Sequence, residues 1–338
     1  MDDDQRSPSV TLRRLVNGYQ VSQAIHVAAT LGVADHLADG PRTSDELAAA
    51  VGAHAPTLYR VLRALAAVGV LHEEDGRRFA LTAVGECLRS DADEPVGGWA
   101  AMIGRPYVWQ AWGALLHSVR TGESAFEHVH GVDPWTYRTR DPDEGAIFDR
   151  AMADLTRRSH RTTLAALDFS RFGTVVDVGG GNGALLVALL RAHSEMRGVL
   201  LDLPYAVAVA DRAIEAAGLS ERCRTVAGSF FDGVPEGGDA YVLRAILHDW
   251  DDDKAGAILA SVRRAVAPEA TLVVIERDLG PANETPETKF SDLNMLAIPG
   301  GRERTIDEYG ALLAAAGFRL VESRPAGFGL SVMVATPA

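Results

Sequence analysis

Cysteine and lysine are scarce in this chain. Of its 338 residues, two are cysteines, Cys87 and Cys223, and two are lysines, Lys254 and Lys289. Two cysteines so far apart give neither a disulfide framework nor the paired spacing of a zinc site, and they fit a reduced, cytoplasmic compartment. With two lysines, the chain offers few candidates for Schiff-base chemistry.

Excess positive charge and long apolar runs are missing as well. The chain has 46 acids against 33 bases, a net charge of −13, so phosphate polymers and anionic membrane surfaces should be repelled. No apolar stretch has the length of a signal peptide or of a membrane span. We therefore expect neither nucleic acid nor membrane as a main partner. The content of 47% hydrophobic and 23% charged residues is typical of a soluble enzyme.

What the sequence does contain is a glycine-rich turn, Gly179 to Gly183, between an apolar strand and an apolar helix. Residues 174–178 are mostly β-branched, as in a buried parallel strand, and residues 184–190 continue as a helical apolar run. Glycines at such a turn permit backbone conformations closed to other residues and let a ligand approach the free N–H groups of the helix start. The turn predicts a nucleoside-binding site, with a tight turn without ligand as the alternative.

Two acids decide which nucleoside is favoured. The spacing Gly179-x-Gly181-x-x-Ala184 meets the relaxed dinucleotide fingerprint, so NAD stays open on the glycines alone. Asp177 extends the pattern to Asp-x-Gly-x-Gly-x-Gly, which is typical of S-adenosylmethionine (SAM) sites, because a carboxylate there repels a pyrophosphate but suits a cation. Asp202 ends the next strand, 198–202, and is placed to accept both ribose hydroxyls.

The first 90 residues have the pattern of a winged helix. A helical segment over 11–38 precedes a short capped helix from Thr43 and a second helix over 55–67, after which 70–71 and 79–81 can pair around a polar turn. Between residues 41 and 90, six arginines balance six acids, whereas a DNA reader normally shows a basic stripe. We therefore favour a packing or dimerisation module over a winged-helix regulator.

Residues 95–160 are aromatic and irregular in pattern, and they contain all but one of the five tryptophans. Core packing accounts for most aromatic side chains. A mixed aromatic and methionine surface next to a nucleoside-binding domain is also what a pocket for a flat apolar substrate requires. The residues that we assign to this pocket are Trp99, Met102, Phe148 and Met152, together with Asn294 and Met295 further along the chain.

From residue 171 on, strands and helices alternate. We predict strands at 174–178, 198–202, 223–227, 239–245, 271–276, 318–323 and 330–335, with helices between them that include 253–266 and 305–316. This alternation favours a doubly wound parallel sheet, in which ligands bind at the carboxyl ends of the strands. The polar or glycine residues expected at those ends are Gly179, Asp202, Ser229, Arg244, His248 and Glu276.

His248 is the best candidate for a general base. An imidazole with a pKa near neutrality can accept the proton of a phenol or enol while the oxygen attacks an electrophilic methyl group. The acids at 251–253 suggest a metal site or helix capping, and their place just before a helix favours capping. No Gly-x-Ser-x-Gly elbow of a serine hydrolase is present.

Taken together, these segments resemble the SAM-dependent O-methyltransferases of the caffeic-acid and polyketide-tailoring type over essentially the whole chain. The most specific segments are Leu247-His248-Asp249-Trp250 and the run from Pro299 to Thr305. The resemblance implies a Rossmann-like class I methyltransferase sheet, mostly parallel with an antiparallel last strand, behind a winged-helix dimerisation domain. We set the domains at 1–95, 96–165 and 166–338, the middle one being a helical connecting and substrate-pocket segment.

The resemblance also implies roles for single residues. Gly179 and Asp202 would bind SAM, with Ser229 and Phe230 beside the adenine; His248 would be the base, oriented by Glu276 and Glu303. We add Asp177, Gly181 and Arg244 to the expected cofactor-binding residues. The resemblance implies a homodimer and a reaction without metal. Ser229 departs from the aspartate usual in the family, and Arg244 from the usual lysine. Methylation of nitrogen or carbon, or SAM-bound hydroxylase or decarboxylase chemistry, therefore stays open beside O-methylation.

Overall fold

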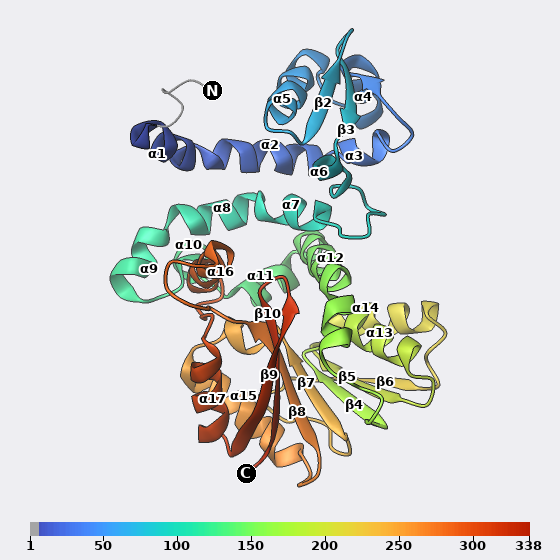
Figure 1. Ribbon diagram of the computed structural model, residues 1–338, viewed down its shortest axis with the longest axis vertical. Helices are drawn as coiled ribbons and strands as arrows, with labels where there is room; N and C mark the ends of the chain where they lie inside the picture. Colours follow the sequence, from blue (N-terminus) through green and yellow to red (C-terminus); the bar gives the residue numbers. More distant parts are fainter. Residues whose placement is uncertain (1–6) are drawn as a thin grey trace. The chain divides into compact units, whose positions relative to one another are not determined.

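The computed structural model describes residues 7–338, apart from the side chains of residues 158, 160 and 161. The chain folds into two compact units (Figure 1). The first runs to Trp109 and includes Asp143–Arg158, and the second contains Gln110–Pro142 and Ser159–Ala338. None of the helices in the described residues combines the length and the apolar character that a membrane span requires.

The first unit contains the predicted order of helix, helix and hairpin. Leu58, Leu62 and Leu65 lie on one face of a helix and are buried against Phe79 of the hairpin, as the apolar spacing predicts. The expected helix over 11–38 is instead three helices, because Asn17 and Gly32 interrupt it. The elements are α1 (Pro8–Val16), α2 (Gly18–Thr30), α3 (Val33–His36), β1 (Arg42–Thr43), α4 (Ser44–Val51), α5 (Ala55–Ala67), β2 (Leu71–Glu74), β3 (Arg78–Leu81), α6 (Ala83–Glu86) and α7 (Gly97–Ile103).

The segment with the irregular pattern is helical. Its helices are mostly six to eight residues long, too short to show a repeating apolar face in the sequence, and some begin at side-chain caps such as Ser124 and Asp133. They are α8 (Pro106–Gly113), α9 (Leu115–Thr121), α10 (Ala125–His130), α11 (Pro134–Arg140) and the longer α12 (Pro142–Ala166).

The second unit is built on a seven-stranded sheet of order β6-β5-β4-β7-β8-β10-β9. Strands β4 to β8 pair in parallel, and β10 is antiparallel to both of its neighbours, which confirms the predicted fold class. The strands are β4 (Thr174–Val178), β5 (Arg197–Asp202), β6 (Cys223–Ala227), β7 (Ala240–Arg244), β8 (Thr271–Arg277), β9 (Phe318–Gly327) and β10 (Leu330–Pro337).

Helices bury both faces of this sheet. One apolar cluster joins it to α13 (Ala184–Ala192) and α14 (Pro204–Ala216), and another joins it to α15 (Asp252–Ala265) and α17 (Ile306–Ala315). Helix α16 (Pro286–Ala297) follows β8. Because β4 to β8 run in parallel, their carboxyl ends share one edge of the sheet, and the predicted polar residues gather there.

Candidate functional site

The glycine turn is tied to the end of the neighbouring strand. The N–H groups of Gly179 and Gly180 donate to the carbonyl oxygen of Leu201, and that of Gly181 donates to Asp202 Oδ2 at 2.7 Å. Gly179 has a φ of +74°, a backbone conformation that other residues rarely adopt. The turn therefore needs glycine for its conformation.

Asp177 lies under this turn as a buried carboxylate. It is 3% exposed, and no described residue forms a hydrogen bond with its Oδ2 atom. Burial raises the pKa of Asp177 to about 7, although the nearby Arg244 guanidinium acts in the opposite direction. At a ligand-binding turn, a carboxylate oxygen without a partner can pair with a cationic group of the ligand, and SAM carries such groups.

Asp202 connects the turn to the start of the next helix. Its two oxygens accept hydrogen bonds from the N–H groups of Gly181 and Leu203, the latter at 2.6 Å, while burial raises its pKa. Each carboxylate oxygen has a second lone pair, so both can still accept a ribose hydroxyl.

The predicted adenine residues border an aromatic cluster formed by Phe230, Phe231, Trp250 and Trp135. Phe231 and Trp250 meet edge to face, with ring centroids 5.0 Å apart, and the Trp135 ring lies 6.5 Å from that of Trp250. Ser229 Oγ accepts a hydrogen bond from the Phe231 N–H, so its own proton remains available as a donor.

Arg244 ends β7 and contacts Ser159 of α12. It donates to Ser159 Oγ at 2.6 Å, and burial lowers its pKa despite the attraction of Asp177 and Glu276.

His248 follows β7 in a short 3₁₀ turn whose backbone is strained. Ala245 has a φ of +53°, which non-glycine residues rarely adopt. Glu276, fully buried at the end of β8, holds this turn because its Oε1 atom accepts from the N–H groups of Ile246 and Leu247, at 2.9 and 2.7 Å. Glu276 thus holds a strained backbone conformation in place, and strain of this kind is typical of functional sites.

Two carboxylates flank one nitrogen of the histidine. His248 Nδ1 lies 3.1 Å from Glu303 Oε1, within hydrogen-bonding distance, and 3.6 Å from Glu276 Oε2. Nε2 lies 3.7 Å from Asp249 Oδ1, too far for a good hydrogen bond. Nδ1 is thus the oriented donor, and Nε2 is left to act on a ligand.

The pKa values of these side chains favour a protonated His248 beside an ionised Glu303. Burial opposes the imidazolium, but the negative charges of Glu303, Glu276 and Asp249 outweigh it and raise the pKa of His248 to about 10. Burial raises the pKa of Glu276 to about 7. Burial acts in the same direction on Glu303, yet His248, Ser291 and Arg277 lower its pKa overall. Glu303 is therefore the ionised partner of the histidine.

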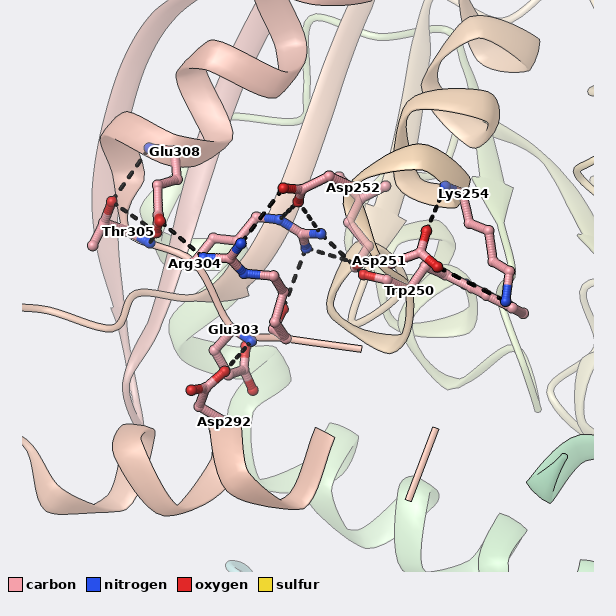
Figure 2. A network of polar contacts seen from close by, with 11 residues as sticks. Trp250, Asp251, Asp252, Lys254, Asp292, Glu303, Arg304, Thr305 and Glu308 are labelled. Atoms are coloured by element: carbon pink, nitrogen blue, oxygen red, sulfur yellow. Dashed lines mark hydrogen bonds and ion pairs between the residues drawn. The ribbon is translucent and has the colours of Figure 1, made fainter. Parts of the chain in front are cut away.

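Arg304, which our sequence analysis did not single out, holds the backbone around His248 (Figure 2). Its guanidinium is buried and donates to the carbonyl oxygens of Leu247 and Trp250, at 3.0 and 2.9 Å, and to Asp252 Oδ1. The neighbouring Gly301 is required because a side chain there would overlap the His248 carbonyl group. Arg304 and Gly301 both lie in the segment from Pro299 to Thr305, whose resemblance to the family was the available signal.

The acids after the histidine have different tasks. Asp251 caps α15 by accepting from the Lys254 N–H at 2.8 Å, as predicted, whereas Asp252 binds Arg304.

The predicted substrate residues are divided between the two units. Trp99 and Met102 lie on α7 and Phe148 and Met152 on α12, all in the first unit, while Asn294 and Met295 lie on α16 in the second. Their contact with substrate stays a prediction. A further residue of the second unit, Trp112, donates its indole N–H to Asn294 Oδ1 at 3.1 Å.

His248, Glu276 and Glu303 are also the group of described residues that could hold a metal ion, since their ligand atoms lie within 4.8 Å of one another. To coordinate a metal, Nδ1 would have to give up the proton that it donates to Glu303. Of the two carboxylates, Glu303 Oε1 is engaged by Nδ1 and Glu276 Oε1 by two backbone N–H groups, while the Oε2 atoms of both have no hydrogen-bond partner among the described residues. That the reaction needs no metal stays a prediction.

Comparison with known proteins shows the family to which the chain belongs. A model of the O-methyltransferase domain matches residues 112–319, and a model of the O-methyltransferase dimerisation domain matches residues 13–91. The fold and the site define a class I SAM-dependent methyltransferase. More narrowly, the chain belongs to the O-methyltransferase family whose catalytic and dimerisation domains these models describe.

Relatives with names for their activity cover nearly all of the chain. It is 40% identical to a phenazine O-methyltransferase of Lysobacter antibioticus, with 100% of both chains covered. It is 38% identical to the 8-amino-8-demethylriboflavin N,N-dimethyltransferase of Streptomyces davaonensis, covering 91% of this chain and 89% of the relative.

A solved structure shares the fold closely. An O-methyltransferase of neocarzinostatin biosynthesis, crystallised with SAM and 2-hydroxy-5-methyl naphthoic acid, matches with a TM-score of 0.81 and 39% identity over 94% of this chain and 96% of that one. SAM rather than NAD is therefore the cofactor, and the protein is a methyltransferase of the natural-product tailoring type.

Proposed function

We propose that this enzyme transfers the methyl group of SAM to a hydroxyl of an aromatic or polycyclic small molecule, with His248 as general base. SAM supplies an electrophilic methyl carbon, and its C–S bond breaks as the new O–C bond forms. His248 Nε2 takes the hydroxyl proton, and the ionised Glu303 stabilises the imidazolium that results. The observation that carries the proposal is that Nδ1 is held by Glu303 while Nε2 is left for the acceptor.

The other predicted residues position the two reactants. Asp177 and the glycine turn would hold the cationic part of SAM, Asp202 its ribose, and Ser229 and Phe230 its adenine. Glu276 keeps the strained turn of His248 in place through two backbone N–H groups. In-line displacement needs little covalent help from the protein, so positioning and proton removal are the main tasks.

The test is methyl transfer from labelled SAM to a panel of phenols and aromatic amines. We expect label in the ether products of phenols, at a rate that EDTA does not reduce, because His248 Nδ1 is already engaged by Glu303. Transfer to amines alone would replace the proposal with N-methylation, which the riboflavin-type relative carries out according to its name. SAM binding without consumption would favour the hydroxylase or decarboxylase alternative.

The raised pKa of His248 predicts a rising pH profile. The imidazolium cannot accept a proton, so activity requires the neutral form, whose fraction grows as the pH approaches about 10. The cationic cofactor disfavours a second positive charge, so the pKa should be lower in the SAM complex. We expect kcat/KM for a weakly acidic phenol to increase between about pH 7 and 9, by up to about tenfold per unit. A flat profile over this range would contradict the assignment.

We also propose a homodimer formed through the first unit. Helices α1 and α2 carry exposed apolar side chains, among them Leu15, Val16 and Tyr19, in the segment that matches the dimerisation model. Light scattering should give the mass of two chains, and a monomer at micromolar concentration would contradict this.

A further inference from the structure

Helix α16 is attached to the catalytic cluster along one face. Ser291 Oγ donates to Glu303 Oε1 at 2.7 Å, the same oxygen that accepts from His248. Asp292 Oδ1 accepts from the Glu303 backbone N–H at 2.9 Å. Residues three positions apart on a helix lie on the same face, about 5–6 Å apart at Cβ. Asn294 is therefore one turn beyond Ser291 on the face of α16 that adjoins the histidine and its carboxylate.

The orientation of the Asn294 amide is fixed by chemistry. An indole N–H can only donate, so the end of the amide that faces Trp112 Nε1 must be the oxygen. The opposite orientation would place two donors against each other. Asn294 is partly exposed, and in the part of the chain that the structure describes, its NH₂ group has no hydrogen-bond acceptor. Trp112 thus makes the free end of Asn294 a pair of donors.

We propose that the Asn294 NH₂ group selects acceptors in which a carbonyl or carboxylate oxygen stands next to the hydroxyl that is methylated, with Trp112 as its positioning residue. The inference rests on the proposed function, because it places that hydroxyl at His248 Nε2. The neighbouring oxygen accepts from Asn294 and is drawn away from its internal hydrogen bond with the hydroxyl. That leaves the hydroxyl proton free to move to His248.

Three matched compounds test this selection: a plain naphthol, the same naphthol with a carboxylate beside the hydroxyl, and the same naphthol with an acetyl group there. The wild-type enzyme should prefer both substituted compounds over the plain naphthol by at least about tenfold in kcat/KM, which is the worth of one hydrogen bond to a strong acceptor. Asn294→Leu should bring the ratio of kcat/KM between the substituted compounds and the plain naphthol down to about one.

Two further variants test the amide itself, one by adding a negative charge and one by removing the N–H that orients it. Asn294→Asp should disfavour the carboxylate compound about 100-fold through repulsion, with a smaller effect on the acetyl compound. Trp112→Phe keeps the ring but removes the N–H that orients the amide, and should reduce the ratio of kcat/KM between the substituted compounds and the plain naphthol. Asn283→Asp is the matched control, because it adds the same charge at an exposed position in the loop before α16.

The outcomes separate this inference from the proposed function. If all three compounds are methylated alike, or if Asn294→Leu slows all three equally, the selection by Asn294 is wrong and the methyltransferase proposal stands. If no compound is methylated, the proposed reaction fails, and calorimetry with the three compounds on the protein loaded with S-adenosylhomocysteine still reports the preference. Equal affinities there would overturn the inference too.

Discussion

The His248→Ala variant is expected to lose methyl transfer to phenols by about 10²- to 10⁴-fold, the usual contribution of a general base. His248 is the described histidine whose one nitrogen is held by two buried carboxylates, at 3.1 and 3.6 Å, while the other nitrogen is left without a good hydrogen bond. Without the imidazole, the hydroxyl proton has no acceptor of suitable pKa. SAM affinity should change little, because the glycine turn and Asp202 are untouched.

Two further variants make this result interpretable. His248→Gln retains a donor for Glu303 and so separates the loss of the base from the loss of the buried ion pair. His72→Ala removes an exposed histidine of β2 in the first unit and should have no effect. Turnover of His248→Gln near that of the wild type would show that another group removes the proton.

The largest expected effect on stability belongs to Arg304→Met, which we predict to lower the free energy of unfolding by about 3–5 kcal/mol. The Arg304 guanidinium is 1% exposed and donates to three backbone carbonyls and to Asp252. A methionine fills similar space but leaves those carbonyl oxygens without a donor. The turn that presents His248 should loosen as well, so activity should fall at temperatures where the protein is still folded.

Arg302→Met is the matched control for this variant. Arg302 lies two residues earlier, its side chain is 45% exposed, and it contacts Asp252 at 3.5 Å and Glu308 at 3.0 Å. Exposed ion pairs of this kind contribute about 0–1 kcal/mol. Chemical denaturation of both variants, with the wild type alongside, measures the difference. Equal losses would mean that the buried contacts of Arg304 carry no special weight.

The sheet could be predicted from the sequence because each strand has a recognisable local pattern of residues. The strand at 174–178 is an apolar run bounded by glycines, and the parallel pairing then brings Asp177, Asp202 and His248 to one edge without further information. The winged-helix hairpin was equally visible, with Leu71 opposite Leu81 around its polar turn.

The rest of the site depends on contacts between distant segments. Trp112 and Asn294 are separated by 182 residues, and nothing in either local pattern marks them as partners. Arg304 binds backbone carbonyls, which every residue carries, so its role shows only once the turn is folded. Helix α16 escaped prediction because polar residues such as Ser291 and Asp292 lie on the face that adjoins the catalytic cluster, where an apolar stripe would be expected.

The most direct test of the central claim, that His248 removes the proton as the methyl group is transferred, varies the acidity of the acceptor. The wild type and His248→Gln would be compared in single turnovers on related phenols, from weakly acidic ones to one whose electron-withdrawing substituents keep it ionised at the assay pH. An ionised acceptor has no proton to remove. We predict a large defect of the variant on the weakly acidic phenols that shrinks to near zero on the ionised one. A defect of the same size across the whole series would contradict the account.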